Sequence, residues 1–233
     1  MSKDAQHTKL HTDETPWALN FVVRAEKDAV VCHDDAVLAA ARATVLLLDD
    51  PRAEDQWKPS IDSWTDGRIR KLCRRASGTR FEATRSFEHV EVTIGSAQVR
   101  AFVPCLVTEQ PHDIAKLQLS GTEFARRDRD YVDVEELSNT LVVFENPGVD
   151  VTSAKWAVQV AHGAQLASRR HKADPERYAH WVAAGMPMVL VRPSAKEWEA
   201  LVIAGEGLTT VFIRDAGFTE VEPNTLTTIA RYV

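Results

Sequence analysis

Short apolar runs alternate with longer amphipathic stretches in the second half of the chain. The apolar runs are typical of buried strands, and the stretches between them have the spacing of helices. We predict strands at 140–145, 187–192, 209–214 and 224–231. We predict helices between them at 152–170 and 194–205. This alternation indicates an α/β fold with a mixed four-stranded sheet flanked by helices.

The first half shows a similar sequence of patterns. An apolar run at 19–24 predicts a strand, and 36–48 predicts a helix that is apolar on most sides and should be buried. A second helix is predicted over 61–76, where apolar residues stand among many arginines. Segments 90–94 and 97–103 alternate in polarity around a Gly-Ser pair, which predicts a hairpin.

Residues 104–137, between the halves, have two prolines, many charges and little periodicity, so we interpret this region as a connector. The polar N-terminus is typical of a disordered tail. The expected division is a tail at 1–15, an N-terminal α/β domain at 16–104, a connector at 105–137 and a C-terminal domain at 138–233.

The two halves also resemble each other in sequence. Residues 75–84, RASGTRFEAT, align with residues 192–201, RPSAKEWEAL, and Trp64 aligns with Trp181. The fold is therefore expected twice, as a tandem arrangement in which the first copy has lost its chemistry. In this register Asp35, Ala39 and Arg42 stand where Lys155, Gln159 and His162 stand. Chance similarity between two α/β units stays open as the alternative.

Composition restricts the function. The chain has 44% hydrophobic and 27% charged residues and no apolar run long enough to span a membrane. Its three cysteines are widely spaced, which favours neither a disulfide framework nor a zinc site and fits a reducing cytoplasm. The formal net charge of −6 has the wrong sign for a general nucleic-acid binder, so any RNA contact must use local basic patches.

One helix face and one turn carry the candidate chemistry. Lys155, Gln159 and His162 lie at i, i+4 and i+7, so they share a face near the start of the helix. Asp215 ends an apolar run at a turn made possible by Gly217. Ligand sites in open α/β sheets lie outside the carboxyl ends of strands, where this Asp would meet the helix. The alternatives are a solvated helix stripe and a simple turn-forming Asp.

These motifs resemble those of the class II peptidyl-tRNA hydrolases. That family has a K-x-A-A-Q-x-(A/S)-H-A helix, matched here by KWAVQVAHG from Lys155, and a D-A-G-x-T turn, matched from Asp215 to Thr219. The resemblance covers about 138–233. The chain departs from the family pattern at three positions, where Ser153 replaces a lysine, Phe218 an arginine and Glu220 a glutamine. Fewer positive charges therefore face a ligand.

The resemblance implies a hydrolase that cleaves the ester of peptidyl-tRNA, with tRNA as partner. Lys155 would bind an oxyanion or phosphate near the helix N-terminus. Asp215 would orient Lys155 or accept a proton, and His162 would act as a base or only pack. Gln159, Thr219 and Thr225 would contact substrate.

The ester reaction requires neither a metal nor an organic cofactor. The first half would form an intrachain pseudo-dimer with the second, in place of the second subunit that such enzymes often have, and further self-association stays open. The alternative function is a non-catalytic RNA-binding or protein-interaction module that retains the fold.

The densest basic run of the chain lies in its first half. Residues 66–85 carry a local net charge of +5 from seven basic and two acidic side chains. Its basic residues are Arg68, Arg70, Lys71, Arg74, Arg75, Arg80 and Arg85. We expect this run, and Arg70 and Arg74 in particular, to contact the tRNA backbone. The alternative is a solvated face without a ligand.

Overall fold

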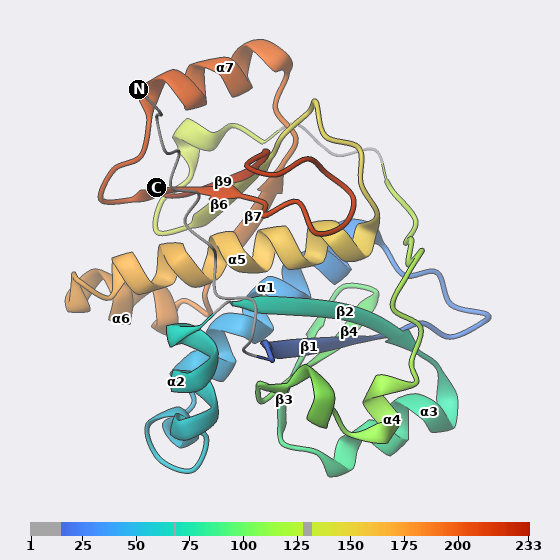
Figure 1. Ribbon diagram of the computed structural model, residues 1–233. Coiled ribbons are helices and arrows are strands. Elements are labelled where there is room, and N and C mark those ends of the chain that lie inside the picture. The colour runs from blue at the N-terminus through green and yellow to red at the C-terminus, as the bar shows by residue number, and fades with distance from the viewer. Residues whose placement is uncertain (1–14, 68, 128–131) are drawn as a thin grey trace, which may run out of the picture.

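The computed structural model describes residues 15–67, 69–127 and 132–233 (Figure 1). The tail predicted for residues 1–15 lies outside the described residues except for Thr15, and Arg68 of the basic run lies outside them as well.

The second half is built as the hydrophobic pattern predicted. Its elements are β6 (Leu141–Glu145), α5 (Ser153–His171), α6 (Pro175–Ala183), β7 (Met188–Val191), α7 (Ala195–Ala204), β8 (Thr210–Arg214) and β9 (Leu226–Tyr232). The sheet has the order β7-β6-β9-β8, with β6 and β7 parallel and the remaining pairs antiparallel. The mixed four-stranded sheet is therefore confirmed. Helix α6 was not predicted.

The first half contains a second sheet. Its elements are β1 (Trp17–Arg24), α1 (His33–Asp49), a 3-10 turn (Pro51–Glu54), α2 (Lys58–Asp66), β2 (Arg70–Ala76), α3 (Gly78–Ala83), a 3-10 turn (Thr84–Ser86), β3 (His89–Ile94) and β4 (Ala97–Phe102). The strand order is β2-β1-β4-β3, and a short strand, β5 (Cys105–Leu106), also pairs with β1. Strands β3 and β4 form the predicted hairpin.

The helix predicted over 61–76 is wrong in its second part. Helix α2 ends at Asp66, Gly67 follows, and 70–76 form a strand that pairs in parallel with β1 along its whole length. The arginines of this segment resemble the polar face of a helix. Two of its charged side chains, Lys71 and Arg74, are buried by partners that are distant in sequence, so local periodicity could not identify the strand.

The two sheets have the same topology. Each has its second strand, first strand, fourth strand and third strand in that order, with the same relative directions. A shared detail supports the match. The Trp64 indole donates to the carbonyl of Arg70 at 2.9 Å, and the Trp181 indole donates to the carbonyl of Pro187 at 3.1 Å. In both halves the tryptophan ties a helix to the start of the following strand. The α/β fold that occurs twice is confirmed.

Helices α1 and α5 lie against each other between the two sheets (Figure 1). Helix α1 packs on β3 and β4 of its own sheet and also contacts β7, whereas α5 packs on its own sheet and also contacts β2. The largest cluster of buried apolar residues draws on both halves, with Phe21 and Trp64 from the first and Val143 and Trp156 from the second. Burial of α1 on most sides is the reason for its alanine-rich sequence.

The connector is packed rather than loose. After β5 it forms a 3-10 turn (Val107–Glu109), helix α4 (His112–Ala115) and a second 3-10 turn (Val134–Glu136). Ile114 and Leu117 pack on the outer face of the first sheet, and Val134 and Leu137 pack on the outer face of the second. The connector thus joins the two outer faces. The division into separate domains remains a prediction, because the main core is shared.

Within the described part of the chain, no helix has the length and apolar character needed to cross a membrane.

Candidate active site

The start of α5 is held in place by a cap and by the loop between β8 and β9. The Thr152 hydroxyl accepts a hydrogen bond from the Lys155 amide at 3.2 Å, as an N-cap residue does. Glu220 accepts from the Thr152 amide at 2.7 Å and from its hydroxyl at 2.9 Å. The loop therefore closes over the first turn of the helix, and the first charged side chain inside that turn is Lys155.

Lys155, Gln159 and Asp215 converge as the sequence predicted. The Lys155 ammonium lies 2.6 Å from Oδ2 of Asp215, and the Gln159 amide donates to the same oxygen at 2.6 Å. The ammonium also donates to the Thr219 hydroxyl at 3.0 Å. The side chains of Lys155 and Asp215 are only 10% and 8% exposed. Because the pair is shielded from water, its electrostatic attraction is stronger than that of a surface ion pair.

The turn after β8 aims the carboxylate at the helix. Oδ1 of Asp215 accepts from the Gly217 amide at 2.8 Å, which leaves Oδ2 for α5. Gly217 has a φ of +76°, and a Cβ there would stand 2.5 Å from Pro223. Only glycine fits this conformation and this space, so the D-A-G sequence is required by the geometry of the turn.

Sequence reasoning selected Thr225 and missed Thr227. The Thr227 hydroxyl donates to the Gln159 side-chain oxygen at 2.6 Å and is fully buried, so it orients the amide with its nitrogen toward Asp215. Thr225 instead donates to the Glu222 carbonyl at 2.6 Å within the loop. The sequence held a signal for Thr227, because it stands two residues after Thr225 in the predicted strand 224–231, and residues two apart on a strand face the same side of a sheet.

His162 lies beside a lysine of the first half rather than beside the carboxylate. Lys71 donates to Nδ1 of His162 at 2.8 Å and to Gln165 at 2.5 Å. Burial, together with the positive charges of Lys71 and Lys155, lowers the pKa of His162 well below its ordinary value. Burial also lowers the pKa of Lys71 well below its ordinary value. His162 is therefore neutral near pH 7 and a weak proton acceptor.

The two arginines selected from the basic run lie in different surroundings. The Arg70 guanidinium lies over the ring of Phe218, 4.9 Å from its centre, and so reaches the loop that carries Asp215. Arg74 is buried and donates to Asn20 and to the connector. Its connector partners are the carbonyls of Ala115 and Leu117 and the side chain of Gln110. Arg74 thus ties the connector to β2, which corrects the expectation that it faces a ligand.

The first half has a different group at the place of Lys155. Asp35 on α1 accepts from the amide and the hydroxyl of Ser96, each at 2.7 Å, in the turn between β3 and β4. Lys155 reaches the corresponding loop between β8 and β9. Ala39 stands in place of Gln159, and Arg42 donates to the Met186 carbonyl at 3.0 Å. This end of α1 carries an acid where α5 carries a cation.

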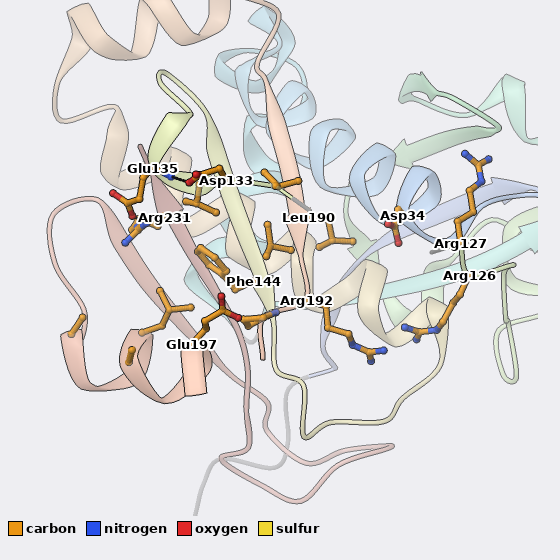
Figure 2. Close-up of a pocket in the computed structure, with 17 residues that line it drawn as sticks. Asp34, Arg126, Arg127, Asp133, Glu135, Phe144, Leu190, Arg192, Glu197 and Arg231 are labelled. Atoms are coloured by element: carbon orange, nitrogen blue, oxygen red, sulfur yellow. Dashed lines mark hydrogen bonds and ion pairs between the residues drawn. The ribbon is translucent and has the colours of Figure 1, made fainter. Parts of the chain in front are cut away.

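A cavity of about 750 Å³ lies elsewhere, between α7 and the outer face of the second sheet (Figure 2). Phe144 and Leu190 line it, and Arg231 lies at its edge, 3.6 Å from Glu135. It contains none of the predicted site residues. Over the ranges 15–67, 69–127 and 132–233, no group of three His, Cys, Asp or Glu side chains has a geometry that holds a metal ion.

Fold and site together define an α/β protein whose polar centre is a shielded lysine–carboxylate–amide cluster between a helix start and a strand end. The family of peptidyl-tRNA hydrolase PTH2 matches residues 140–231. The peptidyl-tRNA hydrolase of Thermococcus onnurineus is 39% identical over 84 residues, which cover 34% of this chain and 71% of that protein. The chain belongs to the peptidyl-tRNA hydrolase PTH2 family.

Two further relatives match a slightly longer part of the chain. The peptidyl-tRNA hydrolase of Thermococcus sibiricus is 37% identical over 93 residues, 38% of this chain and 79% of the relative. That of Staphylothermus marinus is 34% identical over 93 residues, 38% of this chain and 76% of the relative. The family match includes Lys155, Gln159 and Asp215 and does not extend to Arg70.

Proposed function

We propose that the chain hydrolyses the ester that joins a peptide to the terminal ribose of tRNA, and so acts in translation on peptidyl-tRNA. The observation that carries this proposal is the convergence of Lys155, Gln159 and Asp215 inside the family-matching segment. The peptidyl-tRNA hydrolases that match this segment favour a hydrolase over the non-catalytic alternative.

The reaction adds water to the ester carbonyl carbon and breaks its bond to the ribose oxygen, which gives a peptide acid and a tRNA hydroxyl. Negative charge develops on the carbonyl oxygen in the tetrahedral intermediate. The Lys155 ammonium and the N-terminus of α5 would stabilise it. Asp215 would hold Lys155 in position, since Oδ2 already accepts two hydrogen bonds and Oδ1 a third.

The other predicted site residues would support this centre from the side, and Gln159 among them is buried. Thr219 lies on the exposed loop and bonds Lys155, and Gln159 is positioned by Thr227, so both hold the cluster in shape. His162 would contribute less, because its lowered pKa leaves it a weak base. Thr225 would act only through the loop that it closes.

The first half would act as a built-in partner. Its α1 packs on α5, and β2 also contacts α5, so the halves would form an intrachain pseudo-dimer. The repeated topology supports an origin by tandem duplication, with the first copy having lost the lysine and the Asp-Gly turn. The free cysteines Cys32, Cys73 and Cys105 support a cytoplasmic location.

A hydrolysis assay on peptidyl-tRNA with the full chain tests the function. Lys155→Ala and Asp215→Asn should each lower the rate by about 10² or more, the scale of losing one electrostatic catalytic group. Lys196→Ala is the matched control, because Lys196 is exposed on α7 and lies outside the site. Circular dichroism verifies that each variant is folded. Parental rates in both site variants, or an inactive parent, would overturn the proposal.

A further inference from the structure

Two of the three departures from the family pattern are contacts with the first half. Ser153 replaces a lysine, is fully buried, and its hydroxyl lies 2.9 Å from Nδ1 of His33 on α1. Phe218 replaces an arginine, and its ring lies under the guanidinium of Arg70 on β2. The third, Glu220, caps α5 within the second half. The positions that lost positive charge are thus the positions that meet the first half.

Arg70 brings a cation to the loop from which one is missing. Phe218 is 63% exposed and directly precedes Thr219, whose hydroxyl accepts from Lys155. A guanidinium stacked on an aromatic face is held in orientation by the ring and keeps its edge N–H groups available for an oxyanion. The Arg70 side chain is half-buried, and its Nε is enclosed without a hydrogen-bond partner among the described residues, so a ligand would meet the terminal NH2 groups of the guanidinium.

The backbone at Arg70 is held firmly. Its carbonyl accepts from the Trp64 indole at 2.9 Å, and the next residue, Lys71, reaches His162 on α5 at 2.8 Å. Lys71 also lies 5.0 Å from the centre of the Trp64 ring. The start of β2 is therefore fixed against both α2 and α5.

The start of α5 is fixed to the first half in a similar way. His33 links Ser153 to Glu145 of β6, with its Nε2 3.2 Å from the carboxylate, and all three side chains are buried. A cation placed by such a rigid frame loses little conformational entropy on binding a ligand.

We propose that Arg70 is a phosphate-binding residue of the C-terminal site, supplied by the first half and held in place by Phe218. Its ligand is a phosphodiester group of the tRNA close to the ester. This inference rests on the proposed function for the identity of the substrate. It assigns to the first half, which lies outside the family match, a direct part in tRNA binding. It also explains how a chain with a net charge of −6 binds a nucleic acid through a local positive charge.

Deacylated tRNA is the probe, titrated against the full chain over a salt series. Arg70→Ala should weaken binding about tenfold, the scale of one charge-assisted hydrogen bond. The slope of log affinity against log salt should fall by about one. Arg177→Ala is the matched control, since Arg177 is exposed on α6, which follows the opposite end of α5 from the site, and lies outside the basic run. It should bind as the parent does.

Phe218 supplies a second and independent test. Phe218→Leu should weaken tRNA binding, and adding Arg70→Ala to it should cost less than Arg70→Ala costs in the parent, because the platform is already lost. Phe218→Arg should restore affinity in the Arg70→Ala background, since it returns a cation to the loop. In hydrolysis assays Arg70→Ala should raise KM and leave kcat nearly unchanged.

The outcomes separate this inference from the proposed function. The parent protein could bind tRNA without hydrolysing peptidyl-tRNA, and the Arg70→Ala variant could bind tRNA more weakly. That result would contradict the proposed hydrolase function and support the role of Arg70. A parent that hydrolyses, with Arg70→Ala and Arg177→Ala indistinguishable in affinity and salt slope, would overturn the role of Arg70. Additive effects of the Arg70 and Phe218 substitutions would overturn the platform.

Discussion

Lys155 and His162 share one face of α5 but have opposite electrostatic surroundings. The ammonium of Lys155 meets a carboxylate at 2.6 Å, whereas His162 meets the nitrogen of Lys71 at 2.8 Å. Desolvation and the neighbouring Lys71 and Lys155 lower the pKa of His162 well below its ordinary value, so its imidazole is neutral near pH 7. These surroundings, rather than the residue types alone, favour Lys155 as the electrostatic group of the reaction.

A substitution at His162 follows from this contrast. His162→Asn keeps an acceptor for Lys71 and should lower the hydrolysis rate by less than about tenfold, against the 10² expected for a lost electrostatic catalytic group. The pH dependence of stability should also change. The folded-state pKa of His162 is lowered, so its contribution to stability is present above the unfolded value of about 6.5 and is lost as pH falls toward the folded value.

Urea unfolding at pH 7 and pH 5 measures this contribution. The parent should lose more free energy of unfolding between the two pH values than His162→Asn, because only the parent takes up this proton on unfolding. Equal losses in both proteins, or a rate defect as large as that of Lys155→Ala, would show that His162 has a different role.

At the scale of elements, α5 is positioned by close approach to its own sheet. Gly163 lies where a Cβ would stand 3.2 Å from the Cβ of Ala230 on β9, with Val143 of β6 and Ile213 of β8 at 3.7 and 3.8 Å. Because Gly163 has no side chain, α5 can pack closely against the strands of its sheet. The two preceding turns of the same helix carry Lys155 and Gln159 to the edge where β8 ends.

Enlarging this position should therefore disturb both packing and site. Gly163→Val should lower the free energy of unfolding by about 1–3 kcal/mol, the typical cost of an overpacked core. Gly207→Val is the control, because a Cβ at Gly207 meets no atom within 4 Å. Urea denaturation compares the two variants. A Gly163 variant as stable as the control would show that α5 lifts away from the sheet at little cost.

At the scale of the whole molecule, the two halves share one core. Helices α1 and α5 are buried against each other between the sheets, and the main apolar cluster contains residues of both halves. Separating the halves would expose this face of α5, and contiguous apolar surface of that kind drives association or unfolding.

The excised segment 138–233 tests how far the halves depend on each other. We expect that it does not persist as a folded monomer, and that it unfolds or self-associates through α5. Size-exclusion chromatography with light scattering gives its mass, and circular dichroism gives its helix content. A folded, soluble monomer of parental activity would show that the first half is dispensable and that the shared core adds little.

The chain's own patterns predicted most of the elements and the centre of the site. Short-range periodicity was sufficient for the strands of the second half and for α5, because buried strands and amphipathic helices repeat at fixed intervals. Lys155 and Asp215 were expected to meet, since a helix start and a strand end lie at the same edge of an α/β sheet. The matching segments 75–84 and 192–201, together with Trp64 and Trp181, predicted the repeated topology.

Only the tertiary structure decided that Arg70 reaches the site and that Arg74 stabilises the fold instead. Arg70 and Arg74 lie on one strand, yet one stacks on Phe218 and the other is buried under the connector. The same holds for Ser153. Comparison with the family pattern shows only that a lysine is absent there, whereas the structure shows that Ser153 contacts His33. Sequence determines local structure through neighbours along the chain, whereas the role of a charged side chain depends on partners that only the packing of the two halves brings near.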